Sequence, residues 1–201
     1  MLFFLFIYHL FGLDYETKNL YGCIWVRIFY HDSTGGVFFS NFSETMFSLE
    51  EKRFSLFKLV NNRFKVDGMY EFLLEYPGIS GYNRWKQSLL PWEDIEVLNQ
   101  QAIGYKPISI SWSDYWGGLV KSNNGFDGVV LLDGSAGLNH WWYSLGVINT
   151  GPFYPFYPGP CSLVYRSTLW IRVSSPSVLV IGSSLQKKLL VLTIPYILTI
   201  I

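Results

Sequence analysis

The sequence predicts an all-β fold in which antiparallel strands form a sandwich. Short apolar runs alternate with polar residues at a period of two, as expected for strands that bury one face. Clusters of Gly, Pro, Asn and Asp separate these runs and favour tight turns. Helical periodicity is nearly absent, so a parallel sheet with helical crossovers is not expected.

Six segments show the strand pattern most clearly: residues 24–30, 69–76, 108–112, 128–132, 141–147 and 164–173. Turns are expected at 32–36, 76–78, 116–118, 123–125 and 133–135. A single helical turn is expected at 48–52, where Ser48 precedes Glu51 at capping-box spacing. The charged and amide-rich segment 91–101 is expected to be an exposed loop. Six strands without intervening helices indicate a sandwich of the jelly-roll or galactose-binding-like type.

The fold is expected to span residues 22–173, between two apolar ends. Half of the 201 residues are hydrophobic and 15% are charged, which favours one domain with a sizeable core over disorder. Residues 1–21 form an apolar leader, for which a signal peptide and a membrane anchor both stay open. Residues 174–201 form an apolar tail that is not expected to belong to the fold. Its apolar end, 189–201, is shorter than the roughly 20 residues that span a bilayer, so a lipid-anchor signal and an unrelated segment are its two interpretations.

Charge and motif content argue against several classes of partner. The 15 basic and 15 acidic residues balance without a basic block, so nucleic acid is not expected as a partner. Cys23 and Cys161 fit no metal or redox spacing and either form a disulfide or stay free. Neither His31 nor His140 has a second ligand at metal spacing, and no phosphate-binding loop or dinucleotide fingerprint occurs. We therefore expect neither a metal nor a cofactor.

A short pattern occurs near both ends of the predicted fold. Trp25 and Arg27 alternate with apolar residues in one strand, and Trp170 and Arg172 do the same in another. Because the terminal strands of a sandwich often lie side by side, we expect the two pairs to stack guanidinium groups on indole rings. The repeated pattern predicts a structural clasp.

No recognisable catalytic arrangement is present. Glu71 and Glu75 lie on the same face of a predicted strand, but their backbones would be about 13 Å apart, beyond the carboxylate spacing of glycosidases. We expect them on a solvated face whose opposite side carries Tyr70, Phe72, Leu74 and Tyr76. A nucleophile elbow is also missing. The chain is therefore expected not to be an enzyme.

The aromatic residues suggest a binding role. We predict a non-catalytic module for carbohydrate or glycoconjugate, because sugars are held by aromatic rings beside amides, carboxylates and guanidinium groups. Residues of these types gather in the predicted loops and form the candidate ligand-binding set: Tyr82, Asn83, Arg84, Trp85, Trp116, Asp133, Asn139 and Trp142. For any single tryptophan the alternative is a place in the core.

Three clusters carry a family resemblance. They are residues 82–87 (YNRWKQ), residues 116–122 (WGGLVKS), and the LDGS motif at 132–135 followed by NHWWYSLG at 139–146. Together with the Trp25 and Trp170 patterns they resemble an uncharacterised β-sandwich module of predicted surface or secreted proteins of protists and simple animals. The resemblance covers roughly 150 residues and implies an extracellular accessory domain that binds a ligand.

A second functional class stays open. The chain is alternatively a protein–protein interaction or adhesion domain of a surface protein, because the proline-spaced segment 152–160 could present aromatic residues in a polyproline II conformation. The expected partners are a glycan or a surface protein, with membrane association through the terminal apolar segments. Secretion or display at the cell surface is predicted, with a cytoplasmic location as the alternative.

Overall fold

The computed structural model describes residues 16–32, 52–93, 96–113, 115–121, 131–134, 143–146 and 164–174. Several predicted features lie outside these ranges: most of the leader and tail, the helical turn at 48–51, the turn at 123–125, Cys161, Asn139, Trp142 and the segment 152–160. Cys23 is a free thiol. The described part contains no helix long and apolar enough to cross a membrane.

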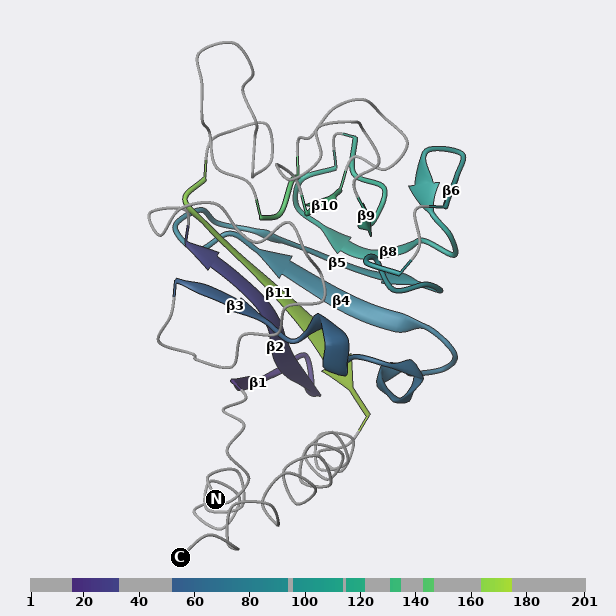
Figure 1. Ribbon diagram of the computed structural model, residues 1–201, viewed down its shortest axis with the longest axis horizontal. Helices are drawn as coiled ribbons and strands as arrows, with labels where there is room; N and C mark the ends of the chain where they lie inside the picture. The colour runs from purple at the N-terminus through teal and green to yellow at the C-terminus, as the bar shows by residue number, and fades with distance from the viewer. Residues whose placement is uncertain are drawn as a thin grey trace, which may run out of the picture.

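One open antiparallel sheet organises the described chain (Figure 1). Its order is β1 (Thr17–Leu20), β2 (Cys23–Asp32), β11 (Arg166–Val173), β4 (Tyr70–Glu75), β5 (Tyr82–Gln87) and β8 (Lys106–Ile110). A seventh strand, β3 (Arg53–Ser55), pairs with β2. The antiparallel all-β class that the sequence predicts is therefore confirmed.

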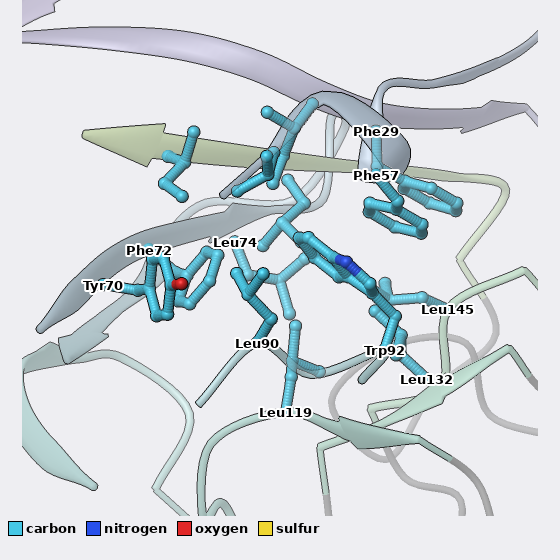
Figure 2. Packing of buried hydrophobic residues seen from close by; sticks show 14 of the residues in the cluster. Phe29, Phe57, Tyr70, Phe72, Leu74, Leu90, Trp92, Leu119, Leu132 and Leu145 are labelled. Carbon is cyan, nitrogen blue, oxygen red and sulfur yellow. The ribbon is translucent and has the colours of Figure 1, made fainter. Parts of the chain in front are cut away.

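Smaller elements make up a second layer over one face of this sheet. The two-stranded pair of β9 (Val120–Lys121) and β10 (Leu132–Asp133) is extended by a bridge between Leu132 and Leu145. The 3-10 helices η2 (Phe57–Leu59) and η3 (Asn62–Phe64) follow β3, and β6 (Val97–Leu98) forms a hairpin with β7 (Gln101–Ala102). Leu132 and Leu145 face the main sheet (Figure 2).

The core lies between the main sheet and this second layer. Alternate residues of the central strands point into it, as the period of two requires. Phe72 and Leu74 of β4 are fully buried there, as predicted, and they pack in one cluster with Leu119 and Leu132 (Figure 2). On the same side, Trp92 stacks on Phe57 with ring centroids 4.2 Å apart. Burial of these large aromatic side chains is the main source of stability.

The strands that carry the repeated Trp/Arg pattern lie side by side, as expected. In the antiparallel register, Trp170 pairs with Arg27 and Arg172 pairs with Trp25. A bulge between Leu169 and Trp170 shifts this register. The last described strand, β11, lies between β2 and β4 in the middle of the sheet, so closure of the fold requires contacts between distant parts of the sequence.

Three sequence-based predictions are corrected. The sheet includes Thr17–Leu20, because β1 pairs with β2 inside the segment 1–21 assigned to a leader. Residues 82–87, expected to contribute loop residues, form strand β5 between β4 and β8. Segment 91–101 is not simply an exposed loop, since it holds the buried Trp92 and the β6–β7 hairpin.

Two inward amides of β5 join the sheet to its connections. The Asn83 carboxamide accepts bonds from the backbone N–H groups of Ser111 (3.1 Å) and Trp112 (3.2 Å). The Gln87 carboxamide accepts from the Leu119 N–H at 3.1 Å and donates to the Leu119 carbonyl at 3.0 Å. These buried amides satisfy backbone groups that have left the strand ladder.

Gln87→Ala is expected to destabilise the protein by about 2 to 4 kcal/mol, because it leaves both backbone groups of Leu119 without their buried partner. Urea denaturation measures the change. The matched control is Gln101→Ala, which removes an exposed amide and should change the free energy of unfolding by less than about 0.5 kcal/mol. Equal costs for the two substitutions would contradict the assigned role of Gln87.

Candidate functional site

The second face of the main sheet, here called the outer face, carries charged and aromatic side chains from neighbouring strands. Trp25, Leu73 and Trp170 form a small buried cluster there, with Leu20 and Tyr82 packed against it. The charged members around this cluster are Lys18, Glu71, Glu75, Arg84, Lys86 and Arg172. The outer face is therefore a partly covered aromatic surface that is crossed by ion pairs.

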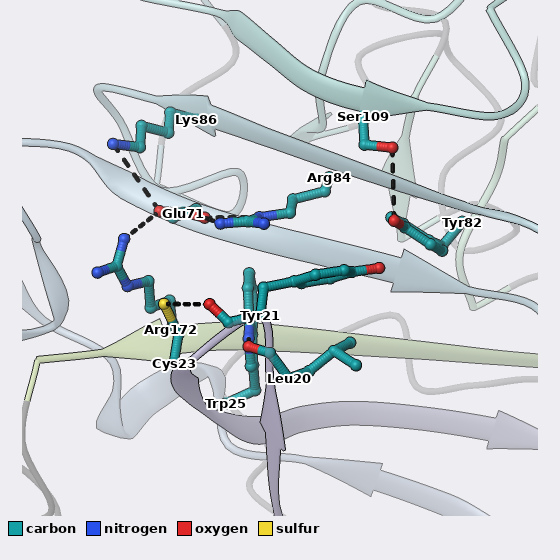
Figure 3. Close-up of polar contacts among 10 residues, drawn as sticks. All are labelled: Leu20, Tyr21, Cys23, Trp25, Glu71, Tyr82, Arg84, Lys86, Ser109 and Arg172. Atoms are coloured by element: carbon teal, nitrogen blue, oxygen red, sulfur yellow. Dashed lines mark hydrogen bonds and ion pairs between the residues drawn. The ribbon is translucent and has the colours of Figure 1, made fainter.

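Glu71 lies at the centre of the outer face. Nη2 of Arg84 lies 2.6 Å from Oε1 of Glu71, and Nε of Arg84 donates to the same oxygen at 2.8 Å. Nη1 of Arg172 contacts Oε2 at 2.8 Å, and Nζ of Lys86 lies 3.8 Å from that oxygen (Figure 3). The prediction that Glu71 faces solvent is wrong: its side chain is 0% exposed. The strand alternation was correct, but cations from both neighbouring strands cover the carboxylate.

Glu75 has a different environment at the other end of β4. Its Oε2 lies 2.6 Å from Nζ of Lys18 and accepts a 2.7 Å hydrogen bond from Nε1 of Trp170. Its side chain is 31% exposed, so this ion pair remains in contact with water. Lys18 also lies 4.2 Å from the centre of the Trp170 ring, which adds a cation–π contact.

The cations over the two repeated tryptophans differ from the expected ones. Arg84 lies 5.4 Å from the Trp25 ring and Lys18 lies over Trp170, whereas we expected Arg27 and Arg172 in these roles. Arg172 instead bonds Glu71. Arg27 lies over Tyr30 and Phe54, at 5.2 Å from each ring. The predicted pairing of the two strands is present, but the cations that stack on their tryptophans come from β1 and β5.

The β1–β2 turn places Tyr21 beside this cluster. Tyr21 and Gly22 both have positive φ angles, 55° and 68°, as in the type I′ turns of two-residue hairpins. Tyr21 is 46% exposed, and its ring centre lies 5.8 Å from that of Tyr82 and 4.8 Å from the Arg84 guanidinium. Figure 3 shows Tyr21 and Tyr82 on the same side of the sheet as Arg84.

Hydrogen bonding perturbs the titration of Tyr82 and Arg172 on the outer face. The Ser109 hydroxyl donates to the Tyr82 oxygen at 3.5 Å, which favours the phenolate and lowers the pKa of Tyr82 below its usual value. The hydrogen bond to Glu71 raises the pKa of Arg172. Both shifts follow from direct polar contacts with neighbours on adjacent strands.

The structure separates the residues that the sequence grouped as ligand-binding. Tyr82 and Arg84 lie on the outer face, but Asn83 and Trp85 point into the core and are 0% exposed. Consecutive residues of one strand point to opposite sides, so these four cannot converge on one ligand.

Two further members of that set are also buried. Trp116 is 6% exposed and packs edge-on against Trp85 and Tyr143, with ring centroids 4.7 Å and 5.1 Å away. Asp133 of β10 is 5% exposed. Asn139 and Trp142 lie outside the described residues. Only Tyr82 and Arg84 are therefore seen at one partly exposed site.

Sequence analysis missed Lys18, Tyr21, Lys86 and the central role of Glu71. If 82–87 had been recognised as a strand, Tyr82, Arg84 and Lys86 would have been expected on one face. Glu71 and Glu75 of the preceding strand lie beside them on that same face. The Tyr21-Gly22 pair before an alternating strand is a weak hairpin signal. These two signals would have located the site.

The outer face combines paired carboxylates with exposed aromatic and cationic groups. Glu71 and Glu75 are each held in ion pairs by cations from other strands of the sheet. Among the described residues, no group of three or more metal-ligating side chains forms a potential metal site. What the face offers a ligand is a pair of tyrosine rings, a hydroxyl group and several guanidinium or ammonium donors.

Comparison of the chain with protein families, curated proteins and solved structures finds no match. The resemblance to a module of surface or secreted proteins stays a prediction.

Glu71→Gln is expected to cost about 3 kcal/mol of unfolding free energy, because it removes the buried counter-charge of three cations. Thermal and urea denaturation measure the loss. Glu75→Gln is the matched control: its carboxylate is partly exposed, so the expected cost is below about 1 kcal/mol. A cost for Glu71→Gln no larger than that of the control would refute the central role of Glu71.

Proposed function

We propose that this protein is a non-catalytic binding module that recognises carbohydrate or glycoconjugate on the outer face of its main sheet. The observation that supports this most is Tyr21, an exposed aromatic residue with φ 55° that lies beside Tyr82 and under Arg84. The site comprises Tyr21, Tyr82, Arg84 and Ser109. It keeps two of the residues expected from the sequence and replaces the buried ones.

The conformation of Tyr21 is costly for this residue type. Non-glycine residues lose roughly 1–2 kcal/mol in the left-handed region, and the first position of a type I′ turn favours Asn, Asp or Gly. Two other two-residue turns of the chain follow that preference, beginning with Asp67 (φ 54°) and Asn99 (φ 50°). Backbone strain often occurs at functional positions, and at Tyr21 it coincides with the neighbouring Tyr82 ring and Arg84 guanidinium, which supports a ligand-binding role for Tyr21.

The chemistry of the site suits a sugar. The C–H faces of a sugar ring pack on aromatic rings, and its hydroxyl groups bond planar charged groups and hydroxyls. Two tyrosine rings with centroids 5.8 Å apart provide the apolar platform. Arg84 and Ser109 lie on neighbouring strands, paired in register, and provide the polar contacts.

Protein recognition is the second candidate function. Strand β8 ends the strand order of the main sheet within the described residues, and its Ile108 is 43% exposed. An extended peptide could add to such an edge through backbone hydrogen bonds. Pro107 lacks an N–H group and interrupts the donors of this edge. This weakens the second candidate relative to the first. Secretion or display at the cell surface stays a prediction.

A glycan array probed with the full chain, followed by titration of the best glycan, tests the proposal. We expect binding to at least one glycan and a loss of about fivefold or more in affinity for Tyr21→Asn. Stability should change by less than about 1 kcal/mol, because relief of backbone strain offsets the lost ring contacts. Calorimetric titration and urea denaturation separate these two effects.

Tyr115→Asn is the matched control. Tyr115 is also an exposed tyrosine with positive φ, 61°, but it precedes the buried Trp116 and lies in the connection to the second layer. This substitution should leave glycan affinity unchanged. Absence of binding to every glycan, or equal losses in the two variants, would refute the proposed function. Capture of an extended peptide under the same conditions would instead favour recognition at β8.

A further inference from the structure

We propose that the ligand of the outer face is an acidic saccharide, whose carboxylate or sulfate group is held by Arg84, Lys86 and Arg172 while a neighbouring sugar ring packs on Tyr21 and Tyr82. This inference rests on the proposed function and adds the chemical class of the ligand. It comes from the charge balance around Glu71 and from the donors that Glu71 does not use.

Positive charge exceeds negative charge at the centre of the outer face. Arg84, Lys86 and Arg172 contribute three positive charges around the negative charge of Glu71, and the carboxylate of Asp67 also interacts with Arg172, which leaves a local excess of one. The whole chain has no net charge, so the excess is a property of this site. It persists at the surface, since the three side chains are 15%, 24% and 26% exposed, respectively.

Glu71 leaves part of the hydrogen-bonding capacity of these cations to other acceptors. Its contacts use Nε and Nη2 of Arg84 and Nη1 of Arg172, so Nη1 of Arg84 and Nη2 of Arg172 are not committed to it. The Nζ of Lys86 lies 3.8 Å from the carboxylate, longer than a hydrogen bond. Guanidinium and ammonium donors bind carboxylate and sulfate oxygens with short, charge-assisted bonds.

The cationic groups are held in place before any ligand arrives. A fully buried carboxylate anchors side chains from β5 and β11, and these strands are inside the sheet rather than in loops. Pre-organised donors lose less conformational entropy on binding than free side chains do. The arrangement therefore favours a bound anion over a transient surface contact.

The spacing along β5 sets the size of the ligand. Tyr82, Arg84 and Lys86 alternate on the outer face, at about 6.6 Å per step, so Tyr82 and Lys86 are about 13 Å apart along the strand. A single sugar ring cannot contact both ends of this row. An oligosaccharide with its acidic group toward Lys86 can.

The other end of the face does not offer a second anion site. Lys18 is already paired one-to-one with Glu75 at 2.6 Å, and Glu75 also accepts from Trp170. The positive charge of Lys18 is therefore balanced locally by Glu75. This difference predicts that an acidic ligand lies in one direction along β5, with its acidic group at the Lys86 end.

Titration of the full chain with three saccharides of similar length tests the inference. The probes are a heparin-derived oligosaccharide, which carries sulfate and carboxylate, an oligogalacturonate, which carries carboxylate alone, and a neutral cello-oligosaccharide. We expect at least one acidic probe to bind tenfold or more tightly than the neutral one, with an affinity that falls as salt is raised. Binding of the heparin probe alone would identify sulfate as the recognised group, and binding of both acidic probes would identify carboxylate.

Lys86→Gln and Lys58→Gln provide the matched variants. Lys86 makes the longest contact with Glu71, so its loss should not unfold the protein; Lys58 is exposed on η2, away from the outer face. Lys86→Gln should weaken acidic binding at least fivefold and leave neutral binding unchanged, while Lys58→Gln should change neither. Equal affinity for neutral and acidic probes, or equal effects of the two variants, would overturn the inference while the proposed function stands. Absence of binding to all three probes and to the glycan array would overturn both.

Discussion

The buried carboxylate of Glu71 determines how the outer face is organised. Strand β4 lies between β11 and β5, and Glu71 bonds an arginine from each of these neighbours. Without this carboxylate, the three cations that β5 and β11 supply on either side of β4 would repel one another in a partly dehydrated environment. With it, they form one network that also fixes register, because a one-residue slip would move Glu71 to the core. The register of the central strands and the organisation of the outer face therefore depend on the same side chain.

Strands with apolar alternation could be predicted from the sequence. β2, β4 and β11 bury aliphatic or aromatic residues at every second position, and all three were expected close to their observed bounds. β5 was missed because its inward positions are Asn83, Trp85 and Gln87, so polarity does not alternate along it. The inward amides are stable only because their backbone partners arrive from distant segments, and local sequence cannot reveal those partners. The two-residue strands β6, β7, β9 and β10 are too short to have a period.

The candidate site was harder to predict than the fold. Aromatic residues next to Gly, Asp or Asn suggested loop platforms, but Trp85 and Trp116 meet edge-on in the core. Burial of large rings stabilises a small sandwich, so local residue type does not distinguish a platform from a core residue. Tyr21 gave only the weak hairpin signal of the Tyr21-Gly22 pair, since its place in the site comes from a positive φ and from neighbours on β5. Glu71 appeared solvated because polar residues on the second face of a strand usually are; its burial results from charges on two other strands.

Stability and binding place different demands on the cations of the outer face. A single buried carboxylate needs one or two close cations to offset its lost hydration, and Arg84 and Arg172 meet that need at 2.6 to 2.8 Å. Lys86, at 3.8 Å, adds little to this balance. A third cation beside a satisfied carboxylate raises the repulsion among like charges in the folded state, unless an anion from outside joins the network. The proposed acidic ligand would therefore account for the position of Lys86, whereas the fold accounts for the position of Glu71.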